Sequence, residues 1–130
     1  MVYGYAGKLL KIDLTDEKVE KEDLDEGFAR KYLGGMGFAY RMLWDKLKPG
    51  VNPLGPENVL MFLLGPLNGI LPGKLTVAFK SPATGGVGVA FASGNFQAEL
   101  KFAGYDGIIF TGKAKKPVYV YIKDDLVEIR

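Results

Sequence analysis

The stretch that decides the fold is Val59-Leu60-Met61-Phe62-Leu63-Leu64, followed by Gly65-Pro66-Leu67-Asn68-Gly69. A continuous apolar run that ends in turn residues is typical of a β-strand buried on both faces. Such a strand needs neighbouring strands and a covering layer on each side. The chain is therefore expected to form a sheet with both faces covered around residues 59–64.

Strand patterns recur on both sides of this run. Residues 7–14 and 18–22 mix or alternate polar and apolar side chains around Thr15-Asp16-Glu17, which predicts a hairpin. Further strands are expected from β-rich composition between short turns, at residues 75–79, 108–111, 118–122 and 126–129. Residues 51–58, which contain two prolines, are expected to form an ordered loop.

Helical spacing appears in three places. Asp23 or Asp25 can cap a helix that runs to Leu33 and ends at Gly34-Gly35. A second helix is expected over residues 38–47, with Met42 and Trp44 packing in the core, and a short third one over residues 96–103. The predicted fold class is α+β in a single domain, residues 1–130: a strand-dominated, β-sandwich-like base with a helical pair and one short extra helix.

Composition excludes several kinds of chemistry. The 130 residues include no cysteine and no histidine, which removes disulfides, iron–sulfur ligation and imidazole acid–base catalysis. The net charge of +2 is evenly spread, and the cluster Lys113, Lys115 and Lys116 is interpreted as a solvated turn, so no nucleic-acid partner is expected. No apolar run approaches the roughly 20 residues of a membrane span. A cytoplasmic protein without a membrane partner is expected.

Many of the 18 glycines fall between Gly65 and Gly107. Glycine-rich loops after buried strands can turn several backbone N–H groups toward one anion such as a phosphate. A β-rich domain with many tight turns explains the same composition. The pattern is neither a P-loop, because Leu75 follows Gly73-Lys74, nor a dinucleotide fingerprint, whose third glycine is missing.

Seven short motifs carry a resemblance to a known family. They are Tyr3-Gly4-Tyr5-Ala6-Gly7-Lys8, Asp13-Leu14-Thr15, Ala29-Arg30-Lys31-Tyr32-Leu33-Gly34-Gly35, Asn52-Pro53-Leu54-Gly55-Pro56-Glu57-Asn58, Gly65-Pro66-Leu67-Asn68-Gly69, Lys80-Ser81-Pro82-Ala83-Thr84-Gly85 and Glu99-Leu100-Lys101-Phe102-Ala103-Gly104-Tyr105-Asp106. In this order and spacing, the chain resembles the amino-terminal, pterin-cradling domain of the tungsten-containing aldehyde:ferredoxin oxidoreductases.

The resemblance implies a function for the whole enzyme. Family members oxidise aldehydes to carboxylic acids and pass electrons to ferredoxin. Their tungsten is held by two dithiolene pterins, the bis-molybdopterin form called tungstopterin, beside a four-iron cluster. The cluster ligands and the acid–base residues lie in later helical domains. This chain is therefore expected to hold no catalytic residue and no metal ligand, and to be inactive alone.

The resemblance also suggests cofactor-binding residues. Gly73 and Lys74 occupy the place of a glycine followed by a cation that reaches the pterin, although lysine lacks the bidentate fork of arginine. Ser93 and Gly94 occupy the place of a glycine pair, with Asn95 next to them. In register, Phe91 replaces an asparagine that helps bind the magnesium between the pterin phosphates. Phenylalanine offers no oxygen to a hard cation.

Two readings of the function remain open at this point. One is a tungstopterin-binding domain of an oxidoreductase, and the other is a stand-alone, non-catalytic relative that lost the cofactor and acts as a partner-binding or assembly subunit. The partners expected are the remaining domains or subunits, ferredoxin for the full enzyme, and a second copy of the chain. Self-association is expected because an uncovered sheet face or edge invites pairing.

Overall fold

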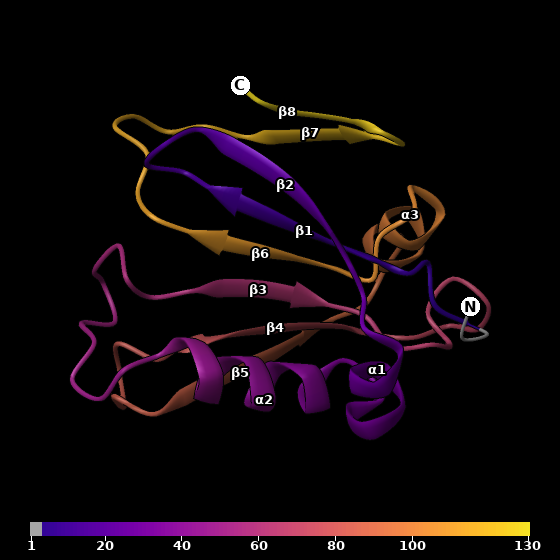
Figure 1. The fold of residues 1–130 in the computed structure, drawn as a ribbon, viewed down its shortest axis with the longest axis horizontal. Coiled ribbons are helices and arrows are strands. Elements are labelled where there is room, and N and C mark those ends of the chain that lie inside the picture. Colours follow the sequence, from indigo (N-terminus) through magenta and orange to yellow (C-terminus); the bar gives the residue numbers. More distant parts are fainter. Residues whose placement is uncertain (1–3) are drawn as a thin grey trace.

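The computed structural model describes residues 4–130, so Tyr3, which opens the first motif, lies outside the described residues. Its main feature is a six-stranded sheet with the order β2-β1-β6-β3-β4-β5 (Figure 1). The strands are β1 (Lys8–Asp13), β2 (Lys18–Asp23), β3 (Leu60–Leu63), β4 (Leu75–Lys80), β5 (Val87–Ala92) and β6 (Gly107–Thr111). Neighbours pair antiparallel except β1 and β6, which are parallel. The apolar run thus supplies β3, a central strand.

The predicted hairpin is confirmed as β1 and β2. The Asp13 carboxylate closes the turn by accepting hydrogen bonds from the backbone N–H groups of Thr15, at 2.8 Å, and Asp16, at 3.1 Å. These two donors lower the pKa of Asp13, that of Asp16 having the larger effect. A short acidic side chain that bonds the backbone two or three residues later is a common turn device.

The helices and a second hairpin cover the two faces of the sheet. Asp25, one of the two predicted caps, accepts a hydrogen bond of 2.6 Å from the Phe28 N–H at the start of the first helix. The remaining elements are α1 (Glu26–Tyr32), α2 (Met36–Lys46), α3 (Phe96–Phe102), β7 (Val120–Lys123) and β8 (Leu126–Ile129). Helices α1 and α2 lie on one face, and α3 with the β7–β8 hairpin packs on the other (Figure 1).

Side-chain alternation along the strands builds the two cores. Leu9, Met61 and Ile109 point to the helical pair, whereas Leu10 and Ile108, each one residue away, point to the hairpin and α3. This three-layer arrangement confirms the α+β, strand-dominated class with a helical pair and a short extra helix. Among residues 4–130, no helix is long and apolar enough to cross a bilayer.

One strand was not predicted, and two sequence predictions need correction. The expected strands did not include residues 87–92, which form strand β5. Leu60 is 39% exposed, so β3 is not buried on both faces along its whole length. Trp44 is 80% exposed and belongs to no core, although Met42 is buried as expected. Helical spacing places a side chain on a stripe of the helix, but it does not say which neighbour covers that stripe.

Candidate cofactor-binding site

The predicted cofactor-binding residues meet at one end of two neighbouring strands. Leu75 at the start of β4 pairs with Ala92 at the end of β5. Gly73 and Lys74 come just before that pair, and the segment Ser93–Asn95 comes just after it. Gly73 is half-buried, whereas Lys74 and the segment Ser93–Asn95 are exposed. The sheet register therefore brings together two segments that lie about twenty residues apart in the sequence. We call the region formed by Gly73, Lys74, Ser93, Gly94 and Asn95 the cradle.

A buried amide pair fixes the loop that leads into the cradle. Asn68 accepts a hydrogen bond of 2.7 Å from the Gly65 N–H, and it donates to the Gln97 Oε1 at 2.5 Å and to the Lys74 carbonyl at 3.3 Å. Both amide side chains are buried. A Cβ at Gly73 would lie 2.8 Å from the Asn68 Nδ2, so only glycine fits beside this amide. Sequence reasoning missed Asn68 and Gln97, although Asn68 lies in a quoted motif.

A buried ion pair holds the N-terminal segment at the same end of the sheet. The Asp106 carboxylate is fully buried and binds the Lys101 ammonium. It also accepts hydrogen bonds from the backbone N–H groups of Ala6, at 3.1 Å, and Gly7, at 2.7 Å. Lys101 in turn donates to the Gly4 carbonyl at 3.1 Å. These contacts link the C-terminal end of α3 to residues nearly a hundred positions earlier.

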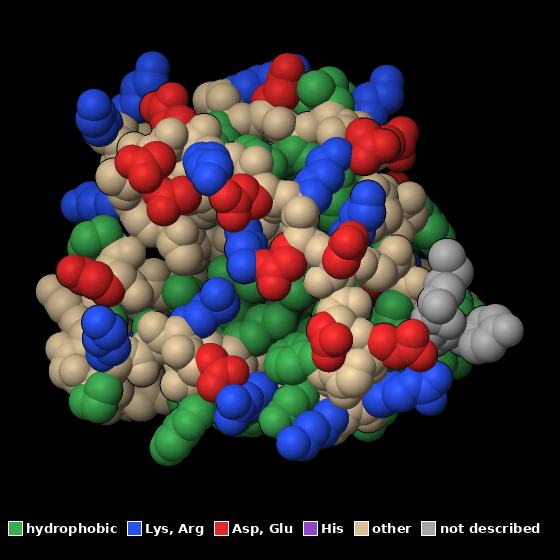
Figure 2. All heavy atoms as spheres, in the orientation of Figure 1, with side chains coloured by type: hydrophobic (Ala, Val, Ile, Leu, Met, Phe, Trp, Pro, Cys, Tyr) green, Lys and Arg blue, Asp and Glu red, His purple; other side chains and the backbone are tan. Residues whose placement is uncertain are grey.

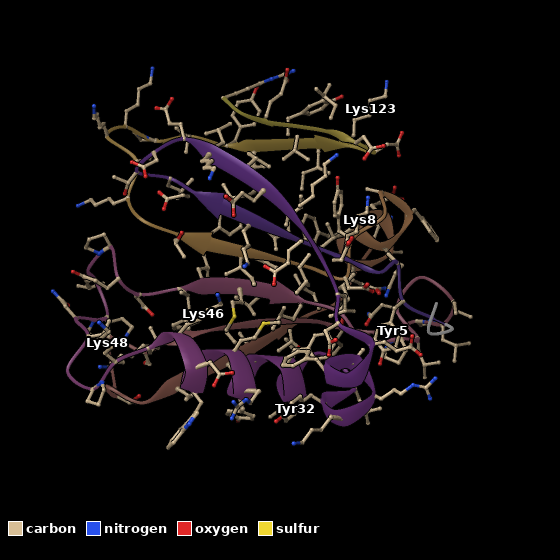
Figure 3. All side chains as sticks on the ribbon, in the orientation of Figure 1. Tyr5, Lys8, Tyr32, Lys46, Lys48 and Lys123 are labelled. Atoms are coloured by element: carbon tan, nitrogen blue, oxygen red, sulfur yellow. The ribbon has the colours of Figure 1, made fainter. Side chains whose placement is uncertain are left out.

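Tyr5 connects this ion pair to the helical pair. Its hydroxyl donates to the Leu33 carbonyl at 2.7 Å, and the Lys101 ammonium lies 5.6 Å from the centre of its ring. Figure 3 shows Tyr5 beside α1. Burial, and secondarily the Asp106 carboxylate, raise the pKa of Tyr5, which keeps the hydroxyl protonated and able to donate. The turn between α1 and α2 is held in addition by the Gly35 N–H, which donates to the Leu64 carbonyl at 3.0 Å.

The chemistry available at the cradle is that of an anion site. Lys74 forms no ion pair within residues 4–130, so its ammonium is available to a phosphate. Asn95 precedes α3, and its side chain makes no capping hydrogen bond. The described residues contain no cluster of three histidine, cysteine or acidic side chains that could hold a metal ion. Phe91 is 53% exposed on β5 and offers no ligand for magnesium.

Comparison with known proteins identifies the family of this chain. Residues 9–130 match the family model described as "Aldehyde ferredoxin oxidoreductase, N-terminal domain". The chain is 48% identical to a tungsten-containing aldehyde ferredoxin oxidoreductase of Pyrococcus abyssi, with 99% of the chain and 22% of that protein covered. It is 49% identical to the WOR-like subunit of an aliphatic sulfonate oxidoreductase of Pyrococcus furiosus, again over 99% of the chain and 21% of that protein. The chain thus spans about a fifth of the length of these relatives.

A solved structure has the same fold. It is the active site complex BamBC of benzoyl coenzyme A reductase with 1,5-dienoyl-CoA, which matches with a TM-score of 0.96 and 41% identity. The match covers 100% of this chain and 20% of the other. The family model, the relatives and the solved structure agree over almost the whole length of the chain. The chain therefore belongs to the aldehyde ferredoxin oxidoreductase family and corresponds to the N-terminal domain region of its members.

Proposed function

We propose that this chain binds the tungstopterin of an aldehyde:ferredoxin oxidoreductase that converts aldehydes to carboxylic acids. The observation that carries the proposal is the cradle, where an exposed Lys74 lies across from the glycine-containing segment Ser93–Asn95 at the paired ends of β4 and β5. Exposed backbone N–H groups beside a lysine are a frequent solution for binding phosphate. The relatives described as tungsten-containing support the choice of cofactor.

The residues present fit the anionic part of such a cofactor. Lys74 would neutralise a phosphate or lie beside the pterin as a point charge, and the N–H groups near Ser93 and Gly94 would donate to the phosphate oxygens. The buried pair Asn68 and Gln97 would keep the loop at Lys74 in place. When bound, the tungsten centre supplies the redox chemistry, while this chain contributes shape and fixed donors.

The charge of Lys74 gives a direct test. Lys74→Ala should weaken the binding of molybdopterin by more than about 1 kcal/mol, the scale of a charge-assisted hydrogen bond. Anaerobic titration of the protein with molybdopterin measures this change. Lys116→Ala removes another exposed lysine, between β6 and β7, and should leave the affinity unchanged. Equal affinities for the wild type and Lys74→Ala would contradict this role of Lys74.

One observation favours the other reading of the function. Phe91 stands where the family resemblance places a magnesium-binding asparagine, and its ring is half-exposed next to the cradle. An apolar side chain there suits a non-catalytic relative that serves as a partner-binding or assembly subunit. Analysis of tungsten, magnesium and pterin in protein purified from its native source separates the two functions. Absence of all three from the purified protein would support the assembly role.

Catalysis by this chain alone is not expected. Without cysteine the chain has no thiolate ligands for a four-iron cluster, so electrons have no relay to an acceptor. We propose that the remaining domains or subunits of the enzyme supply the cluster and the contact with ferredoxin, because the relatives are several times longer. A viologen-linked assay with aldehyde, with or without added tungstate, should show no turnover. Sustained reduction of the viologen would rule this expectation out.

A further inference from the structure

Gln97 carries a buried amide next to both segments of the cradle. Its side chain belongs to α3 and is only 6% exposed. In the sequence it stands two residues after Asn95, which ends one segment of the cradle. A Cβ on Gly73, in the other segment, would lie 3.7 Å from the Gln97 Oε1. Helix α3 and the loop that leads into β4 lie at the same end of the sheet (Figure 1).

Backbone groups fix the orientation of this amide. The Gly65 N–H can only donate, so the Asn68 atom that faces it at 2.7 Å is the side-chain oxygen. The Asn68 nitrogen then donates to the Lys74 carbonyl, at 3.3 Å, and to the Gln97 side chain, at 2.5 Å. A donor needs an acceptor opposite, so the Gln97 atom next to Asn68 is its oxygen. The Gln97 Nε2 group therefore points away from Asn68.

This Nε2 group has two N–H donors, and it makes no hydrogen bond to residues 4–130. Every fully buried side-chain nitrogen and oxygen in that range has a partner, so the Gln97 nitrogen lies where a ligand can reach it. A polar group that loses most of its water and gains no partner destabilises a fold. Gln97 thus presents two donors for which the described part of the chain supplies no acceptor.

The charges around this donor suit an anion. Residues 58–98, which include the whole cradle, contain no aspartate or glutamate, although the chain has 15 acidic residues. Elsewhere the two signs are mixed: on the face shown in Figure 2, acidic side chains lie among the basic ones. Lys74, by contrast, forms no ion pair with any residue from 4 to 130. An anion at the cradle would therefore meet an available cation and no carboxylate from this stretch.

We propose that Gln97 is a further cofactor-binding residue, whose Nε2 group donates to a phosphate oxygen of the cofactor beside Lys74. This inference rests on the proposed function and adds a side-chain donor to it. Asn68 binds both the Lys74 carbonyl and the Gln97 Oε1, so one buried amide sets the spacing between the cation and the donor. Because its oxygen is already held, the Gln97 side chain loses little conformational entropy when the ligand binds.

Gln97 is the only glutamine in the chain, so its side-chain amide gives a single NMR signal that can be labelled selectively with 15N. Titration with molybdopterin, and separately with inorganic phosphate, should shift this signal. Molybdopterin that binds without shifting it would refute the role of Gln97 and leave the proposed function in place. A shift with molybdopterin but none with saturating phosphate would refute the contact with a phosphate oxygen. If molybdopterin does not bind, the proposed function fails, and the phosphate titration still decides whether Gln97 donates to phosphate.

Two substitutions separate the donor from the contact with Asn68. Gln97→Glu keeps an oxygen for Asn68 but replaces the NH2 group, whereas Gln97→Met keeps the length of the side chain and removes both polar atoms. Each should weaken the binding of molybdopterin at least about tenfold, as the loss of a hydrogen bond to a charged group does. Circular dichroism verifies that both variants are folded.

The two variants contradict the proposal in different ways. Wild-type affinity in Gln97→Glu would mean that Gln97 acts only by holding Asn68. Wild-type affinity in Gln97→Met would mean that the added negative charge alone weakens Gln97→Glu. Either result would refute the assignment of Gln97 as a donor to the cofactor.

Discussion

Asp106→Ala is expected to destabilise the protein by about 3 to 5 kcal/mol, the range measured when one partner of a buried ion pair is removed. The change leaves the Lys101 ammonium, whose side chain is only 10% exposed, without its carboxylate. It also leaves the N–H groups of Ala6 and Gly7 without an acceptor. The N-terminal segment, the end of α3 and, through Tyr5, the helical pair would all lose their common anchor.

Urea denaturation followed by circular dichroism measures this loss. Asp125→Ala is the matched control, because Asp125 also forms an ion pair, with Lys21, but its own side chain is 91% exposed. Because solvent screens an exposed ion pair, it contributes little to stability, so the control should unfold near the wild-type midpoint. Asp106→Asn keeps an oxygen acceptor for one of the two N–H groups, so its unfolding midpoint should lie between those of Asp106→Ala and Asp125→Ala. Similar midpoints for Asp106→Ala and Asp125→Ala would show that the buried pair does not anchor the segment.

Local sequence signals were sufficient to predict most of the elements. The Asp25 cap, the β1–β2 hairpin and the apolar run of β3 each depend on residues within a few positions of one another. The boundaries of α2 were less accurate: the helix starts at Met36, not at Phe38, because Gly35 adopts a positive φ of 50° and lets the turn close earlier. A backbone conformation of this kind depends on glycine, and the spacing of hydrophobic residues in the sequence does not reveal it.

Features built from distant residues could not be predicted in this way. Strand β5 was missed because its apolar side chains alternate with glycine and alanine, which weakens the pattern of a strand. Without β5, no argument placed Ser93 next to Lys74, and only the family resemblance selected both. The role of Asp106 was also hidden, because its backbone partners, Ala6 and Gly7, come about a hundred residues earlier. The spacing of apolar residues identifies individual strands and helices, but it does not identify the contacts between them.

Gly37→Ala is expected to destabilise the protein by at least about 2 kcal/mol, as insertion of atoms into a tightly packed region does. Gly37 lies in the first turn of α2, and a Cβ there would be 2.0 Å from the carbonyl oxygen of Tyr32, the last residue of α1. Because the obstacle is backbone, no side chain can rotate away. The two helices would have to separate, which disturbs the turn at Gly34 and Gly35 next to the sheet.

Gly27→Ala is the matched control, since Gly27 also lies in a helix but is exposed. Its Cβ would meet only the Asp25 carboxylate, at 3.3 Å. Alanine is favoured over glycine in a helix by about 1 kcal/mol, so Gly27→Ala should raise the stability slightly. The two substitutions are chemically identical, and they should shift the melting temperature in opposite directions. If both raised it, α1 and α2 would not be in close contact at Gly37. The start of α2 would then be held by the Gly35–Leu64 hydrogen bond to the residue that follows β3 rather than by packing against α1.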